Sequence, residues 1–170
     1  DRHRMSASLD APSARIIALW RRLAGWPGGR WLFSWMIGWM APYTGTIGAR
    51  ALELEPGHSR WSLRDRRRVR NHLNSIHAVA LVNLAEVARG TAMLAALPPG
   101  TRGIVRGLSI EYLKKARGTL IAECRCSPPS AVADQTDYEV TATIRDSAGD
   151  TVATARVVWR LAPESIPAVA

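Results

Sequence analysis

The middle of the chain is one long apolar stretch with polar residues gathered at its start. Only Asn83 and Glu86 interrupt the apolar run of residues 78–88. The polar residues that precede the run are Asn71, Asn74, Ser75 and His77. Because a helix that is apolar on every side belongs inside a fold, the pattern predicts a buried central helix. It should start near Asn71, take Asn74 or Ser75 as its N-cap, and continue to residue 97, where two prolines and a glycine follow.

Shorter segments around this helix alternate between apolar and polar residues, as half-buried strands do. These segments are residues 49–54, 59–64, 103–113, 118–126, 137–146 and 151–161. The residues between the first two and between the last two form tight turns. One long helix followed by antiparallel strands without further helices indicates an α+β fold, in which a sheet curls around the helix and buries it.

Two helices are predicted before the first strand. Residues 13–24 have helical amphipathic spacing, with Ser13 as N-cap, and residues 30–40 form a second helix stopped by Pro42. The apolar run 31–40 has about half the length of a membrane span. We expect both helices to pack on the open face of the sheet. The predicted organisation is a helical extension (1–45), one domain (46–163) and a C-terminal tail (164–170).

The tryptophans leave an alternative for this extension. Five of the seven lie within it, close to arginines: Trp20, Trp26, Trp31, Trp35 and Trp39. Tryptophan beside arginine suits a membrane surface. Residues 14–40 could therefore make a weak membrane-surface contact or cover an acyl chain.

The charge of the chain indicates an anionic partner, because 23 Lys and Arg exceed 14 Asp and Glu, for a net charge of +9. Acidic carrier proteins, coenzyme A phosphates and membranes all qualify. Nucleic acid is not expected, because few aromatic residues accompany the basic ones as a base-stacking surface requires. Cys124 and Cys126 lie two apart on one predicted strand, so they should stay reduced and bind no metal, as in a cytoplasmic protein.

The spacing of Asn71, His77 and Glu86 resembles the motif of the hotdog-fold acyl-thioesterases, in the phenylacetyl-CoA thioesterase-like branch. Residues 110–125 are similar to a second segment of that branch, which consists of a strand, a Leu-basic-x-x-x-Gly turn and another strand. The resemblance covers about residues 50–160. The helical extension is similar to that of a less characterised subfamily.

Two positions depart from the family motif. Asn74 stands where the family has Gly, and Ala78-Val79 replace a Gly-Gly pair. The first change concerns the shape of the loop before the helix. The second keeps the backbone N–H that the family uses, since alanine also has one.

The resemblance implies an acyl-thioester hydrolase with a carboxylate at its centre. Glu86 would be the general base or nucleophile, and the Ala78 N–H would polarise the thioester carbonyl at the helix N-terminus. Asn71 would position substrate or water with its amide, and His77 would orient the loop. No metal or cofactor is implied, because coenzyme A or phosphopantetheine belongs to the substrate. The expected substrate contacts are Asn83, Lys114, Lys115 and Arg117.

The distance between two of these groups predicts a homodimer or a dimer of dimers. Ala78 and Glu86 are eight residues apart, which is about 12 Å along a helix axis. One thioester cannot touch both in a single chain, so the two groups must come from different subunits.

Simpler interpretations stay open for the same residues. Glu86 could pair with Arg89, three residues further on, and Lys114, Lys115 and Arg117 could be a solvated strand end. The alternative function is a non-catalytic acyl-binding or interaction module, with or without membrane contact.

Overall fold

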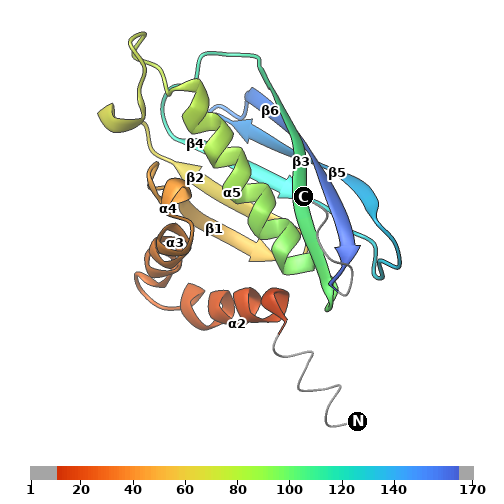
Figure 1. Ribbon diagram of the computed structural model, residues 1–170. Helices are drawn as coiled ribbons and strands as arrows, with labels where there is room; N and C mark the ends of the chain where they lie inside the picture. The colour runs from red at the N-terminus through yellow and green to blue at the C-terminus, as the bar shows by residue number, and fades with distance from the viewer. Residues whose placement is uncertain (1–10, 165–170) are drawn as a thin grey trace.

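The computed structural model describes residues 11–164, in which six strands form one antiparallel sheet around a long helix (Figure 1). The helices are α2 (Pro12–Ala24), α3 (Gly29–Met40), α4 (Pro42–Gly45) and α5 (Ala78–Ala96), and a 3₁₀ turn covers Arg67–Val69. The strands are β1 (Arg50–Glu55), β2 (His58–Leu63), β3 (Thr101–Tyr112), β4 (Leu120–Arg125), β5 (Thr136–Arg145) and β6 (Thr151–Pro163). The predicted α+β class and the sheet wrapped around a central helix are confirmed.

The sheet has the strand order β1-β2-β4-β5-β6-β3, so β1 and β3 are its two edges. Helix α5 lies across the inner face of the sheet and contacts β1, β2, β4, β5 and β6. It is long and apolar enough to cross a membrane, but 67% of its most apolar 18-residue stretch is buried within the fold. The curved sheet therefore covers the apolar surface of α5.

The β1–β2 turn depends on a glycine that contacts a neighbouring chain segment. Gly57 has φ +77°, a conformation that L side chains rarely adopt. A Cβ there would lie 2.2 Å from the carbonyl oxygen of Cys126. The close approach lets the Cys126 N–H donate to the Gly57 carbonyl at 2.7 Å, which anchors the turn to the end of β4.

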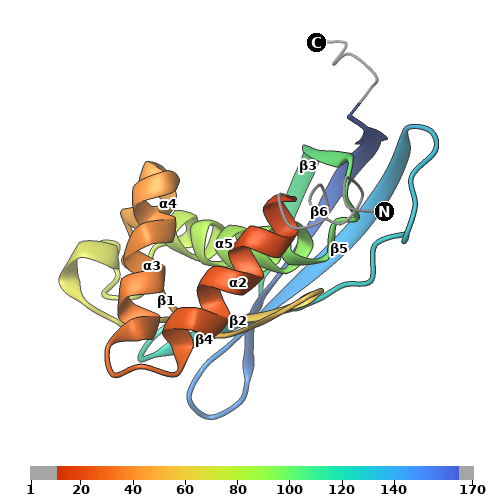
Figure 2. The ribbon, with the colours of Figure 1, turned by 90° about the horizontal axis from the view of Figure 1, so that it is seen from below.

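The N-terminal helices lie beside α5 at the β1 edge, as the view from below shows (Figure 2). Helix α2 buries Ile16, Ile17 and Trp20. The ring of Phe33 in α3 is fully buried, 5.0 Å from Trp20 and 6.3 Å from Trp61 between ring centroids. The extension thus packs on the domain, with α3 against the sheet at β1 as predicted and α2 mainly against α3 and α5 rather than on the sheet. The other face of α3 is exposed.

Several predicted helix boundaries are wrong. Helix α5 begins at Ala78 rather than near Asn71, because the residues before it form a loop. Its N-cap is His77, whose Nδ1 accepts a hydrogen bond from the Val79 N–H at 3.1 Å. Ser13 does not cap α2, because that helix starts one residue earlier, at Pro12. Pro42 ends α3 as predicted but also opens the short α4, where a proline fits the first turn.

The two cysteines are free, with Cys124 buried and Cys126 half-buried. A hydrogen bond with Cys126 and burial raise the pKa of the Cys124 thiol, so it stays protonated as a core residue. Residues 1–10 of the predicted extension, and all of the predicted tail except Glu164, lie outside the described residues.

Candidate active site

The loop before α5 is organised by the side chain of Asn71. Its Oδ1 accepts hydrogen bonds from the Leu73 N–H at 2.9 Å, the Ser75 N–H at 3.2 Å and the Ser75 hydroxyl at 3.2 Å. The Ile76 N–H donates to the Ala116 carbonyl and the His77 N–H to the Val69 carbonyl, each at 2.8 Å. These bonds fix both the loop and the point where α5 begins.

Asn74 adopts a backbone conformation that favours glycine. Its φ is +55°, and it is the only non-glycine residue with positive φ in residues 11–164. Asparagine tolerates this left-handed region better than other L-residues with a Cβ. The substitution at position 74 is therefore compatible with the loop.

The N-terminus of α5 presents a free backbone donor. His77 caps the Val79 N–H, whereas the Ala78 N–H has no hydrogen-bond partner among residues 11–164. Ala78 is exposed. The positive end of the helix dipole lies at the same place, so this N–H can bind a developing oxyanion.

Tyr112, at the end of β3, contacts the first turn of α5. Its hydroxyl donates to the Ala78 carbonyl at 3.1 Å. Tyr112 is 45% exposed, and the partial burial of its side chain raises the pKa of the hydroxyl. Nothing in the sequence distinguishes Tyr112 from the other residues of the family-like segment 110–125. Only the chain fold shows that the end of β3 meets the start of α5.

A cavity of about 360 Å³ opens at this helix end. It is lined by Asn71, Ser75, Ile76, Ala78, Leu81, Tyr112, Leu113, Lys114, Lys115 and Ala116. Four of the predicted site residues, Asn71, Ala78, Lys114 and Lys115, therefore meet in one cavity. The other four, namely His77, Asn83, Glu86 and Arg117, do not line it.

Glu86 lies on the stripe of α5 that faces away from the sheet, in line with Val82, Gly90 and Leu94, all half-buried. Its side chain is 41% exposed. The central helix, predicted to be buried, is therefore not buried on every side of the single chain, because nothing in residues 11–164 fully covers this stripe. The simpler interpretation is also realised, since Arg89 Nη2 donates to Glu86 Oε2.

Arg89 is the most unusual residue near the site. Its side chain is 1% exposed, and the guanidinium carbon lies 4.9 Å from the centroid of the Trp159 ring. Its Nε and Nη1 are buried without a hydrogen-bond partner in the described part of the chain. The sequence suggested Arg89 only as a surface partner of Glu86, so its burial is a finding of the structure.

The remaining predicted substrate contacts have other surroundings. The Lys114 ammonium bonds Asp146 at 2.6 Å and Asp150 at 2.7 Å, which raises its pKa. The Asn83 amide is buried and donates to the Tyr43 carbonyl at 3.0 Å. Lys115 is exposed beside the cavity, and Arg117 is exposed outside it. Among these four, Lys115 is the cation best placed for a bound anion.

A curved antiparallel sheet around a long central helix is the hotdog fold, and in this protein a cavity and a backbone donor lie at the helix N-terminus. The chain belongs to the DUF4442 family, described as a domain of unknown function, which matches residues 29–161. The hotdog fold that the motif spacing implied is confirmed, and so is the assignment to an uncharacterised subfamily.

Solved structures share this fold. The structural-genomics protein APC5556 is 31% identical, with a TM-score of 0.75 over 89% of this chain and 98% of that one. PA5026 of Pseudomonas aeruginosa, called a probable thioesterase, is 22% identical, with a TM-score of 0.68 over 75% of this chain and 91% of that one. The protein smu.793 of Streptococcus mutans UA159, bound to acetyl-CoA, is 21% identical, with a TM-score of 0.57 over 66% of this chain and 87% of that one. No curated protein matches the chain significantly.

Proposed function

We propose that this protein is a homodimeric acyl-thioester hydrolase whose active site is shared between two subunits. The observation that carries the proposal is the Ala78 N–H, which has no hydrogen-bond partner among residues 11–164 and lies at a cavity that Asn71 also lines. Similar hotdog proteins called thioesterases or bound to acetyl-CoA support this assignment. The free thiols suit a reducing cytoplasm.

The edge strand β3 is the surface on which we place the second subunit. It is 12 residues long, pairs only with β6 within residues 11–164, and is exposed along most of its length. Its exposed apolar side chains are Ile104, Val105, Leu108 and Tyr112. A long apolar edge strand of this kind is a template for pairing with another chain. Pairing of two β3 strands would extend the sheet across the dimer.

Such a dimer supplies the carboxylate that the cavity lacks. Glu86 does not line the cavity of its own chain and is about 12 Å along the helix from Ala78. It lies on the uncovered stripe of α5, and the cavity is lined by the end of β3. Two chains joined at β3 would bring Glu86 of one chain toward the Ala78 cavity of the other.

The chemistry then follows from these groups. The acyl carbonyl oxygen would accept the Ala78 N–H, and Glu86 of the second copy would take a proton from the attacking water. The oxyanion would be stabilised by the helix N-terminus. Collapse of the intermediate would break the C–S bond, and the thiolate would receive a proton. Water is the only co-reactant, and coenzyme A or phosphopantetheine leaves as the thiol, with Lys115 near its phosphates.

Purified protein should be tested against a panel of acyl-CoA thioesters that differ in acyl length, with thiol release as the readout. Glu86→Gln keeps the size of the side chain and removes the base, so turnover should fall about a hundredfold or more. Glu139→Gln is a matched control, because Glu139 is exposed on β5. If no thioester is cleaved, or if Glu86→Gln retains full turnover, the hydrolase assignment is wrong.

A non-catalytic acyl-binding module is the second candidate. Val79 is 49% exposed at the N-terminus of α5, where the family has glycine, and the Glu86 carboxylate is engaged by Arg89. Saturable binding of an acyl-CoA, measured by calorimetry, without release of thiol would favour this function.

A further inference from the structure

Helix α3 exposes an unusual amount of aromatic surface. It contains one charged residue, Arg30, and buries only Gly29 and Phe33. Trp31, Trp35 and Trp39 are 55%, 56% and 74% exposed. Because they are four residues apart, they follow one another along one side of the helix, and we call them the tryptophan face. Exposed apolar surface of this extent marks an interaction site.

The flanking side chains continue this surface. Trp26, just before α3, is 74% exposed. Met40, the last residue of α3, and Tyr43, shortly after it, are 68% and 67% exposed. Tryptophan and tyrosine concentrate where water meets the hydrocarbon of a bilayer, because their rings are apolar and their N–H or O–H is polar. The composition of the face therefore suits a membrane surface.

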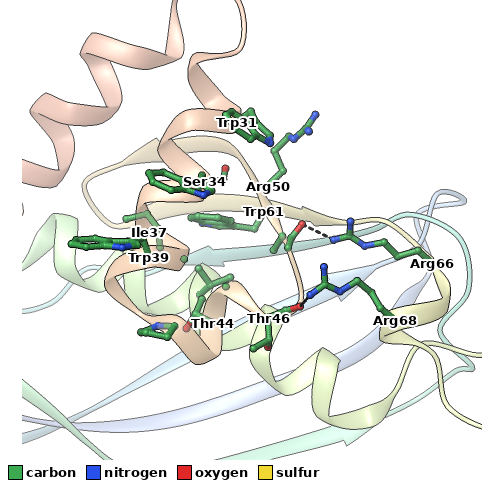
Figure 3. A pocket seen from close by; sticks show the side chains of 17 residues that line it. Trp31, Ser34, Ile37, Trp39, Thr44, Thr46, Arg50, Trp61, Arg66 and Arg68 are labelled. Atoms are coloured by element: carbon green, nitrogen blue, oxygen red, sulfur yellow. Dashed lines mark hydrogen bonds between the residues drawn. The ribbon is translucent and has the colours of Figure 1, made fainter.

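Positive charge surrounds the same face. The tryptophan face lines a cavity of about 610 Å³ together with Arg50, Arg66 and Arg68, which we call the arginine cluster (Figure 3). No member of the cluster forms an ion pair within residues 11–164. Residues 11–52 contain five arginines and no Asp or Glu. An anion near the cluster would meet no opposing carboxylate from this segment.

The arginine cluster is held in place by the backbone. Arg66 Nη2 donates to the Ile47 and Gly48 carbonyls at 2.7 and 3.1 Å, and Arg68 Nη2 donates to the Thr46 carbonyl at 2.9 Å. Arg66 Nε is buried without a partner in the described part of the chain. Burial, followed by the charges of Arg68, Arg64 and Arg50, lowers the pKa of Arg66.

A second copy of the chain is a poor occupant for this face. A two-fold contact would bring the arginine cluster of one copy against that of the other. In addition, α3 packs on β1, at the opposite edge of the sheet from β3 (Figure 1). Pairing through β3 would leave the tryptophan face free.

We propose that the tryptophan face and the arginine cluster dock the protein onto a membrane that contains anionic phospholipid. The indole rings enter the headgroup region, and the arginines contact lipid phosphates. The proposal goes beyond the weak membrane contact expected from the sequence, because α3 packs through one side only and leaves Trp31, Trp35 and Trp39 exposed. Helix α3 has 12 residues and lies along the membrane rather than crossing it.

Co-sedimentation of the full chain with vesicles of phosphatidylcholine, with and without phosphatidylglycerol, tests the proposal. We expect binding to be at least about tenfold stronger with the anionic lipid. High salt should weaken this binding without abolishing it, because screening acts on the arginines and not on the buried rings.

Variants separate the two contributions. Trp35→Ser with Trp39→Ser should weaken binding about tenfold or more, because two large apolar side chains no longer enter the lipid. Arg50→Gln should weaken it roughly fivefold, the effect of one basic residue near an anionic surface. Arg156→Gln is the matched control, because it removes the same charge from an exposed position on β6. Glu86→Gln should bind as the parent does, whether or not the protein is a hydrolase.

Two results would overturn the proposal. One is the absence of binding to phosphatidylglycerol vesicles at low salt by protein whose melting temperature shows that it is folded. The other is parental vesicle binding by the Trp35→Ser, Trp39→Ser variant. A lower oligomeric state of this variant in analytical ultracentrifugation, together with parental vesicle binding, would identify a second copy as the occupant.

Discussion

Glu86 and Arg89 form a hydrogen-bonded ion pair one helical turn apart on α5, with the carboxylate at the surface and the guanidinium in the core. The side chains are 41% and 1% exposed. Because Arg89 is packed over Trp159, it offers a fixed cation to a side chain that is otherwise free to move. The pair thereby holds one carboxylate oriented on the uncovered side of the helix.

Replacement of Arg89 should show whether this residue orients the Glu86 carboxylate for catalysis or only stabilises the fold. Arg89→Met keeps an unbranched apolar stem in place of the arginine stem. It removes two buried donors that have no partner among residues 11–164, so the free energy of unfolding should change by no more than about 2 kcal/mol. Loss of the Glu86 orientation should lower kcat roughly tenfold or more with little change in KM. Arg89→Lys should recover part of kcat. Unchanged kcat in Arg89→Met would show that Arg89 has only a structural role.

Subunit mixing tests the shared active site. Glu86→Gln and Asn71→Ala dimers should each be inactive, whereas a mixture refolded from equal amounts should recover about a quarter of the wild-type sites. In this mixture half of all dimers are heterodimers. Each heterodimer has one intact site, which combines the wild-type Asn71 of one chain with the wild-type Glu86 of the other. Leu108→Lys, on the exposed edge of β3, should yield a monomer in analytical ultracentrifugation and abolish activity. Failure of the mixture to recover activity would indicate that each site belongs to one chain.

The left-handed conformation of Asn74 has a measurable energetic consequence. Asn74→Ala should destabilise the fold by about 1 kcal/mol, because the alanine Cβ disfavours φ +55°. Asn74→Gly should stay within a few tenths of a kcal/mol of the parent, roughly the difference expected between residues that tolerate this region. Urea denaturation measures both, with His72→Ala as a control at an exposed neighbour in the same loop. Equal stability of the Ala and Gly variants would mean that the loop is free to relax.

The stability of the fold at acid pH should depend on Asp65, which lies shortly before the loop of residues 71–77. Its carboxylate accepts from Arg70 Nε at 2.6 Å and from the Gly118 N–H at 2.9 Å. The hydrogen bond from Arg70 holds the pKa of Asp65 below its ordinary value. Such a group stabilises the fold above its unfolded pKa, about 3.9, and this contribution is lost as pH falls through the lower folded value.

Asp65→Asn should therefore be less stable than the parent by about 0.5–1 kcal/mol near neutral pH. The two proteins should converge in urea midpoint below about pH 4. A difference that stays constant into this acid range would show that the loss comes from the altered hydrogen bonds rather than from the charge.

The sequence by itself determined the fold class, the strands and the spacing of Asn71, His77 and Glu86. The apolar run of residues 78–96 is buried on most sides, and the flanking segments alternate with period two. Both patterns can be read from nearby residues alone. A continuous apolar run indicates burial on all faces, and alternation with period two indicates burial on one face.

Only the tertiary structure decided where α5 starts, what surrounds Glu86 and which tryptophans are exposed. The start depends on bonds from the loop to Val69 and Ala116. The exposure of Glu86 depends on the absence of a cover over one stripe of the helix in residues 11–164. The Tyr112 contact with Ala78 joins residues 34 positions apart. These features depend on which distant segments pack together. The sequence shows that Trp39 is apolar, but only the packing of other segments decides whether it is covered or exposed.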